Sequence, residues 1–230
     1  MNLSGKVFIA TGAFGALGQA VTDCLMPYGA KLALLGRRPA VGVAYPAGAL
    51  VYSGVDVSRQ DAVAEVVGQV FKETGRIDGL LNLAGGFQWG KLEGGTLEIW
   101  DSMFRANLLT AAASCQAVLP YLLRGKSGSI VNVGAMGAIK AASGMGAYAA
   151  SKAGVLKLTE ALADELKDHG ITVNAVLPSI LDTPPNRADM PDADFTRWVS
   201  PRALAEVIAF LVSDAARAVS GAALPVAGRV

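Results

Sequence analysis

Short apolar runs of strand length alternate with helix-type patterns along almost the whole chain of 230 residues. This order is typical of βαβ units, in which helices connect parallel strands of one sheet. The sequence therefore predicts an α/β fold, a single-domain Rossmann-like doubly wound parallel sheet of about seven strands with helices on both faces. The predicted strands cover residues 6–11, 31–35, 49–54, 77–84, 128–134, 171–177 and 222–226.

Helix-type patterns fill most of the segments between these strands. The predicted helices cover residues 15–28, 58–74, 97–123, 147–167 and 200–213. Ser58 is the predicted N-cap of the second helix, and Ser200 followed by Pro201 is a typical start of the last one. The remaining segments, 36–48 and 178–199, are rich in glycine, proline or polar residues and are predicted loops. Loops that follow the carboxyl ends of such strands usually bind the ligand.

Charge and composition exclude several classes of function. Charged residues make up 17% of the chain and the formal net charge is +1, so no basic surface for nucleic acid or membrane lipid is expected. Cys24 and Cys115 lie in apolar helical patterns and are expected to be reduced thiols of a cytoplasmic protein. They and His169 lack metal-ligand spacing, so no metal site is predicted. No signal peptide or membrane span is predicted, and residues 1–230 are expected to form one domain.

The segment TGAFGALG, residues 11–18, follows the first predicted strand and opens the first predicted helix. Gly12, Gly15 and Gly18 fit the pattern G-x-x-G-x-x-G, which lets the backbone turn sharply and approach a pyrophosphate. The start of the helix supplies free N–H groups and the positive end of the helix dipole. Such a turn can be purely structural, but its position after the first strand predicts a dinucleotide site.

The second predicted strand ends in Gly36, Arg37 and Arg38. A site for NAD(H) typically has an acidic residue about 20 residues beyond the glycine motif, where it binds the ribose hydroxyls. Two arginines would instead attract a 2′-phosphate through charge-assisted hydrogen bonds. The sequence therefore favours NADP(H) as the cofactor, with NAD(H) possible. The alternative is that both arginines are ordinary solvated loop residues.

Tyr148 and Lys152 have the i, i+4 spacing of one helix face, just after the fifth predicted strand. A phenol has a pKa of about 10 and is a poor acid or base at neutral pH. A nearby ammonium and an oxidised nicotinamide ring would both favour the phenolate and lower that pKa. Tyr148 is therefore the predicted group that exchanges a proton with a substrate oxygen or nitrogen.

Together these motifs resemble the short-chain dehydrogenase/reductase family over nearly the whole chain. The resemblance implies hydride transfer between a nicotinamide cofactor and a small-molecule substrate. It implies Tyr148 as acid–base, Lys152 as ribose ligand and electrostatic helper, and Asn107 as the holder of a proton-relay water. It further implies a homodimer or homotetramer formed through the helices at 97–123 and 147–167.

The motifs and the resemblance together predict the residues that contact the cofactor. Asp56 and Val57 would flank the adenine, and Ile180 and Thr183 would meet the carboxamide end. The complete predicted set is Gly12, Phe14, Gly15, Ala16, Leu17, Gly18, Arg37, Arg38, Asp56, Val57, Asn82, Ala84, Gly85, Tyr148, Lys152, Pro178, Ile180 and Thr183.

Two positions depart from the family pattern. The usual glycine at position 16 is Ala16, with Gly15 beside it, and the usual serine 13 residues before the tyrosine is Ala135. That serine normally donates a hydrogen bond to the substrate oxygen, and loss of such a donor costs roughly 10²–10³ in rate. Ser143 is a weak candidate to replace it. An ordinary ketone or alcohol substrate is therefore less expected.

One branch of the family, the dihydropteridine reductases, is similar in having alanine at this position and a similar loop at 181–198. The favoured hypothesis is reduction of an electrophilic ring such as quinonoid dihydropteridine. Trp89 and Trp198 are candidates to hold this ring, and ordinary packing is the equal alternative for each. Those enzymes generally carry an acidic residue where this chain has Gly36, so the cofactor preference does not carry over. Two alternatives stay open: a general carbonyl or 3-oxoacyl thioester reductase, and a non-enzymatic NADP-binding regulatory protein with a degenerate site.

Overall fold

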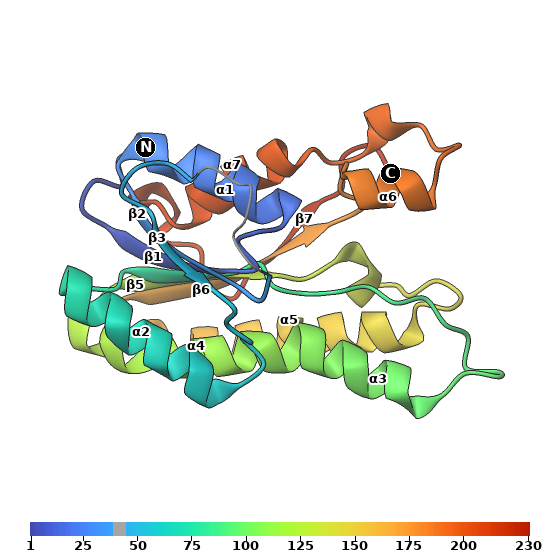
Figure 1. Cartoon of the computed structure of the whole chain (residues 1–230), viewed down its shortest axis with the longest axis horizontal. Coiled ribbons are helices and arrows are strands. Elements are labelled where there is room, and N and C mark those ends of the chain that lie inside the picture. The colour runs from blue at the N-terminus through green and yellow to red at the C-terminus, as the bar shows by residue number, and fades with distance from the viewer. Residues whose placement is uncertain (39–44) are drawn as a thin grey trace.

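The computed structural model describes residues 1–38 and 45–230 and contains one seven-stranded parallel sheet (Figure 1). The strand order is β3-β2-β1-β4-β5-β6-β7, so the direction of winding reverses between β1 and β4. This is the predicted fold class, and the point of reversal is where such sheets bind ligands. The strands are β1 (Val7–Thr11), β2 (Lys31–Gly36), β3 (Leu50–Ser53), β4 (Gly79–Asn82), β5 (Gly128–Val133), β6 (Ile171–Pro178) and β7 (Ala223–Val226).

Helices cover both faces of the sheet, as Figure 1 shows. On one face α1 packs against α7, and on the other α2, α4 and α5 lie together. Two clusters of buried apolar side chains fill the two interfaces, and strand residues alternate between them, with Phe8 in one and Ile9 in the other. The helices are α1 (Ala16–Leu25), α2 (Gln60–Thr74), α3 (Leu97–Met103), α4 (Thr110–Gly125), α5 (Gly146–Leu166), α6 (Pro184–Asp189) and α7 (Pro201–Leu211).

The predicted N-cap residue is observed at the start of α7 but not at the start of α2. Ser200 caps α7 as predicted, because its hydroxyl oxygen accepts a 3.1 Å hydrogen bond from the Ala203 amide. The prediction that Ser58 caps α2 is wrong. The hydroxyl of Ser58 instead donates to the Asp56 carboxylate at 2.7 Å, and α2 begins two residues later at Gln60. The aspartate makes a local turn that competes with capping.

The helix predicted at 97–123 is real but not uniform. Between α3 and α4 the backbone forms a π-helical segment, η2 (Phe104–Leu109), which contains Asn107. π-Helical turns are rare and are often found at functional sites. By length and composition alone, the continuous helix Leu97–Gly125 is apolar enough to cross a membrane, whereas no membrane span was predicted from the sequence. Buried core helices of water-soluble proteins pass the same test of length and composition.

The segment 178–199, predicted to be a loop, contains the short helix α6 and a 3-10 turn at Phe195–Arg197. Arg187 holds this segment together, since it pairs with Asp182 at 2.6 Å and lies 4.6 Å from the centre of the Phe195 ring. A parallel bridge between Leu181 and Val199 closes the base. The segment is therefore an ordered excursion at the carboxyl end of β6.

Candidate active site

The glycine turn between β1 and α1 is shaped by contacts that leave no room for side chains. Gly12 has a φ of +66°, and a Cβ atom there would lie 2.7 Å from the backbone of Ala84. A Cβ on Gly18 would collide with Ala13. Gly15 stands at the start of α1 with no side-chain cap, so the first amides of the helix are free to bind an anion. The turn therefore fits a pyrophosphate.

A cleft of about 860 Å³ opens beside this turn at the carboxyl edge of the sheet. Its volume lies within the usual range for small-molecule and cofactor sites. The predicted residues that line it are Gly12, Phe14, Gly15, Arg37, Arg38, Asp56, Val57, Ala84 and Gly85. Lining residues that the sequence reading missed are Gly36, Ser58, Leu97, Glu98, Asp101, Ser102, Arg105, Ala106 and Thr110.

Most of the missed residues belong to the long helix that begins at Leu97. No glycine motif or charge pattern marks them, and only the packing of α3 against the cleft brings them there. Arg105 forms a 2.7 Å ion pair with Asp101, one turn away on the same helix. Such an exposed pair contributes little to stability, so both side chains are free to turn toward a ligand.

Asp56 lines the cleft a few residues beyond the end of β3. Its carboxylate accepts hydrogen bonds from the hydroxyl and the amide of Ser58, at 2.7 and 3.0 Å. These bonds, reinforced by the charges of Arg37 and Arg59, hold the pKa of Asp56 below its usual value. The aspartate is therefore ionised at neutral pH, and its contact with an adenine stays a prediction.

Asn82, another predicted cofactor residue, has its side chain in the core. Its amide donates to Asn132 Oδ1 at 2.8 Å and lies 3.4 Å from Cys115 Sγ. Asn132 in turn donates to Thr159 Oγ1 at 2.9 Å, which connects β4 and β5 to α5. Asn82 thus supports the sheet through its side-chain amide, and its contact with a cofactor stays a prediction.

The remaining predicted cofactor residues, Tyr148 and Lys152 among them, lie outside the lining of the cleft. Ala16, Leu17 and Gly18 form the first turn of α1. Pro178 ends β6, and the segment that follows it contains Ile180 and Thr183. The backbone carbonyl of Ile180 accepts from Val199 at 2.9 Å, and the Thr183 hydroxyl caps α6. Their predicted contacts with the nicotinamide end remain predictions.

Asn107 organises the catalytic end of the site from within the π-helical segment. Its side chain forms two hydrogen bonds with the Gly86 backbone, accepting from N at 2.9 Å and donating to O at 3.0 Å. It also donates to Ser151 Oγ at 2.9 Å, and that hydroxyl donates to the Tyr148 carbonyl at 2.7 Å. One amide therefore connects the loop after β4 to the helix that carries Tyr148 and Lys152.

Lys152 is buried, and its Nζ donates a 2.7 Å hydrogen bond to the Val133 carbonyl at the end of β5. Burial lowers the pKa of Lys152 to about 8. The Nζ also lies 3.2 Å from where a Cβ on Gly85 would stand, and Gly85 lines the cleft. The ammonium therefore lies beside Gly85, behind the lining of the cleft, where a side chain at position 85 would crowd it.

Tyr148 is half-buried, and its ring meets the ring of Phe87 edge-on with 4.9 Å between centroids. Burial raises the pKa of Tyr148 to about 12. The lowering that the sequence predicts depends on the oxidised nicotinamide ring as well as on Lys152, and it stays a prediction. A phenol with a raised pKa stays protonated at neutral pH, which suits a proton donor in a reduction.

Ala135 occupies the place of the family serine and presents only a methyl group. Its backbone is extended, with φ −165° and ψ 154°, and its side chain is buried. Ser143, the suggested substitute, lies on an exposed turn, and its backbone carbonyl accepts from Trp89 Nε1 at 3.0 Å. The described site therefore has the phenol hydroxyl of Tyr148 but no serine hydroxyl from position 135.

Aromatic side chains lie around the entrance near Tyr148. Phe87 and Trp89 are each more than half exposed, and Trp89 packs on Gly144, where a Cβ would collide with its indole. Sequence reasoning noticed Trp89 but missed Phe87, whose only signal is its position two residues after Gly85. Trp198 is only 8% exposed and packs against Phe195, which agrees with the alternative that this tryptophan is ordinary packing.

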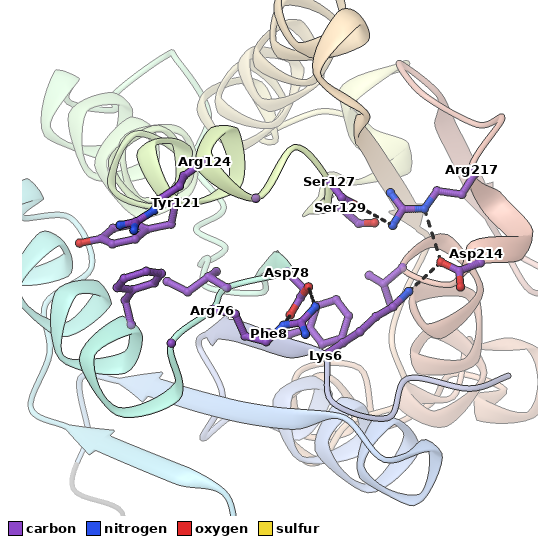
Figure 2. A pocket seen from close by; sticks show the side chains of 15 residues that line it. Lys6, Phe8, Arg76, Asp78, Tyr121, Arg124, Ser127, Ser129, Asp214 and Arg217 are labelled. Atoms are coloured by element: carbon purple, nitrogen blue, oxygen red, sulfur yellow. Dashed lines mark hydrogen bonds and ion pairs between the residues drawn. The ribbon is translucent and has the colours of Figure 1, made fainter.

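A second cavity, of about 430 Å³, lies at the opposite edge of the sheet (Figure 2). Lys6, Asp78 and Ser127 each directly precede a strand, which places it at the amino ends of the strands. Lys6 pairs with Asp214 and Arg76 with Asp78, both at 2.7 Å, and Arg124 and Arg217 also line the cavity, so its cationic side chains outnumber its carboxylates. This cavity is remote from Tyr148 and is not part of the candidate active site.

The structure has a parallel sheet whose winding reverses between β1 and β4, with a glycine turn beside a cleft at its carboxyl edge. A buried lysine lies one helical turn from a tyrosine. Together these features define a nicotinamide-dependent oxidoreductase of the Rossmann type. A model of the short chain dehydrogenase family matches residues 6–194. The chain belongs to this family, whose cofactor is NAD or NADP.

Relatives cover almost the whole chain. A 3-oxoacyl-[acyl-carrier-protein] reductase from Thermotoga maritima is 34% identical, over 99% of this chain and 98% of its own. D-threitol dehydrogenase from Mycolicibacterium smegmatis is 32% identical, over 99% and 93%. Among solved structures, a short-chain type dehydrogenase/reductase from Mycobacterium ulcerans has a TM-score of 0.92 at 26% identity, covering 100% of this chain and 90% of its own. Carveol dehydrogenase from Mycobacterium avium, in complex with NAD, has a TM-score of 0.87 at 28% identity, covering 99% and 98%.

Proposed function

We propose that this chain is an NADP(H)-dependent reductase in which Tyr148 protonates the substrate. One observation carries the proposal: the Asn107 side chain joins the loop after β4 to the helix that carries Tyr148 and Lys152, next to Gly85, which lines the glycine-turn cleft. When bound, the cofactor supplies a hydride. Tyr148 gives its phenolic proton to the substrate atom that gains negative charge, and the Lys152 ammonium stabilises the phenolate that forms.

The preference for NADP(H) rests on the adenosine end of the cleft. Arg37 and Arg38 are exposed and line the cleft directly beyond β2. The position that carries an acidic residue in NAD-type sites is Gly36, so nothing there repels a phosphate. Guanidinium groups form strong, charge-assisted hydrogen bonds with phosphate oxygens.

Two substrate classes are supported by different observations. The names of the relatives support a general carbonyl or 3-oxoacyl thioester reductase, and they support it better than reduction of a dihydropteridine. Ala135 favours the second class, a quinonoid dihydropteridine or similar ring, because an already electrophilic ring needs a proton more than an oxyanion donor. We place the thioester first and keep the ring as the second candidate.

A panel of substrates separates these candidates. NADPH and NADH oxidation is followed with acetoacetyl thioester, quinonoid dihydropterin and a simple quinone, using wild type and Tyr148→Phe. Turnover of the thioester alone supports the first class, and turnover of the pterin alone supports the second. Tight NADPH binding with no turnover of any compound would favour the non-enzymatic regulatory protein.

We also propose an oligomeric state for the protein. The family resemblance suggests a homodimer or homotetramer through the helical surfaces at 97–123 and 147–167. Sedimentation of the purified chain over a range of concentrations tests it, and a monomer at micromolar concentration would contradict it. The cytoplasmic location and the absence of a nucleic-acid, membrane or metal partner stay predictions.

A further inference from the structure

We propose that Phe14 is a cofactor-specificity residue: its ring fills the space beside Gly36 and thereby bars an acidic side chain from the end of β2. This inference rests on the proposed NADP(H) preference and explains how the fold maintains it. Arginines attract a phosphate, but only the exclusion of a carboxylate prevents the NAD-type arrangement from forming next to them.

The contact between the two residues is steric. A Cβ atom on Gly36 would lie 2.7 Å from Cε2 and 2.9 Å from Cγ of the Phe14 ring, and closer still to Cδ2. Gly36 is not among the glycines with positive φ, so its backbone would accept any L-residue. The ring, and not the chain conformation, is therefore what requires glycine at position 36.

Phe14 is held in this place from several sides. It stands in the glycine turn between Ala13, whose amide donates to Leu35 at 3.1 Å, and Gly15, whose amide donates to Gly12 at 3.2 Å. Its ring packs against Tyr45, with 5.5 Å between centroids and 49° between planes. Moving the ring to admit a side chain at position 36 would break this packing, so the exclusion is enforced.

The consequence concerns the ribose that binds at this edge of the cleft. Phe14, Gly36, Arg37 and Arg38 all line the same cleft. With the ring in place, no carboxylate can stand at the end of β2 to accept hydrogen bonds from two ribose hydroxyls. The arginines are then the groups that read the 2′ position, and they favour a phosphate over a hydroxyl.

A double-mutant cycle tests the coupling directly. The four proteins are wild type, Phe14→Ala, Gly36→Asp and the double variant, and the readouts are dissociation constants for NADPH and NADH from nucleotide fluorescence, with thermal unfolding of each protein. We expect Gly36→Asp alone to weaken both cofactors and lower the melting temperature. The double variant should bind NADH at least about tenfold more tightly than Gly36→Asp does, because the carboxylate then fits.

Two results would overturn the inference. One is that Gly36→Asp binds NADH tightly with Phe14 unchanged, and the other is that the two substitutions have additive effects. If the aspartate variant does not fold, the cycle is repeated with Gly36→Ala, whose single Cβ makes the same collision and whose melting temperature should recover in the Phe14→Ala background. A wild type that binds both cofactors equally would count against the NADP(H) preference, whereas the cycle would still report the coupling.

Discussion

Lys152 Nζ donates a 2.7 Å hydrogen bond to the backbone carbonyl of Val133, which ties the middle of α5 to the end of β5. The ammonium is buried, and the described structure gives it no carboxylate as an ion-pair partner. Burial lowers its pKa to about 8. A charged lysine is thus kept in the core at a cost to stability, and groups kept in this way are common at functional sites.

The lowered pKa of Lys152 should make the free energy of unfolding depend on pH. In the unfolded chain the ammonium keeps its usual pKa of 10.5, so between about pH 8 and 10.5 the unfolded state binds more protons than the folded state. The free energy of unfolding therefore rises with pH over this range. Relative to Lys152→Met, wild type should gain about 2 kcal/mol between pH 7.5 and 9.5 in urea unfolding.

The difference between the two proteins is the informative quantity, because the other titrating groups are shared and cancel. A difference that stays constant from pH 7.5 to 9.5 would show that Lys152 titrates normally and that the site is more hydrated than the structure indicates.

Asn107 is expected to be the main positioning residue of the site. Asn107→Ala leaves the amide and carbonyl of Gly86 without their side-chain partner, and each unsatisfied group costs about 1–3 kcal/mol. Ser151→Ala removes two neutral hydrogen bonds, one from the Asn107 amide and one to the Tyr148 carbonyl, and should cost about 1–2 kcal/mol. Urea unfolding of both variants measures the two losses of free energy, and the loss in Asn107→Ala should be the larger. A smaller loss in Asn107→Ala than in Ser151→Ala would contradict the positioning role.

Gly144 should hold Trp89 at the entrance. Gly144→Ala places a side chain at a φ of +75° and drives its Cβ into the indole. Gly94→Ala is the matched control, since Gly94 has a φ of +68° and no atom within 4 Å of its added Cβ. Both should lose about 1 kcal/mol from backbone strain, and Gly144→Ala should also shift the tryptophan emission. If the two variants lose the same free energy of unfolding and have the same tryptophan emission, the contact between Gly144 and Trp89 does not hold the indole in place.

Ala135→Ser should distinguish the two substrate classes. The position is buried and extended, so a serine fits its backbone, and its hydroxyl would add the missing donor to a substrate oxygen. We expect thioester turnover to rise by roughly 10-fold or more, with little change for a quinonoid ring. The ratio of kcat/KM for the two substrates measures the effect. An unchanged ratio would show that alanine is not a substrate determinant.

The fold was predictable because each strand is a short apolar run and each connection contains a helical pattern. Boundaries were less predictable where local side chains compete with the pattern. Ser58 has the chemistry of an N-cap, yet Asp56 captures its hydroxyl. The π-helical segment around Asn107 leaves no mark in the sequence, because it depends on tertiary packing and not on propensity.

The site was predictable where its residues belong to a local sequence motif. It was not predictable where it depends on contacts between residues that are far apart in the sequence. The glycine turn and the Tyr148–Lys152 pair have fixed spacing and were found from sequence alone. The hydrogen bond between Asn107 and Ser151, which connects Asn107 to the helix of Tyr148, joins residues that are 44 positions apart in the sequence. The Phe14–Gly36 contact joins two positions 22 residues apart in the sequence, and only the structure shows that one excludes a side chain at the other.

The central claim is that Tyr148 donates the proton in an NADPH-dependent reduction. The most direct test is a single-turnover measurement of NADPH oxidation by wild type and Tyr148→Phe, with the substrate that the panel identifies and with NADPH binding measured in parallel. The account predicts a rate lower by about 10²–10⁴ in the variant, with NADPH affinity changed little. A variant that oxidises NADPH at the wild-type rate would contradict it.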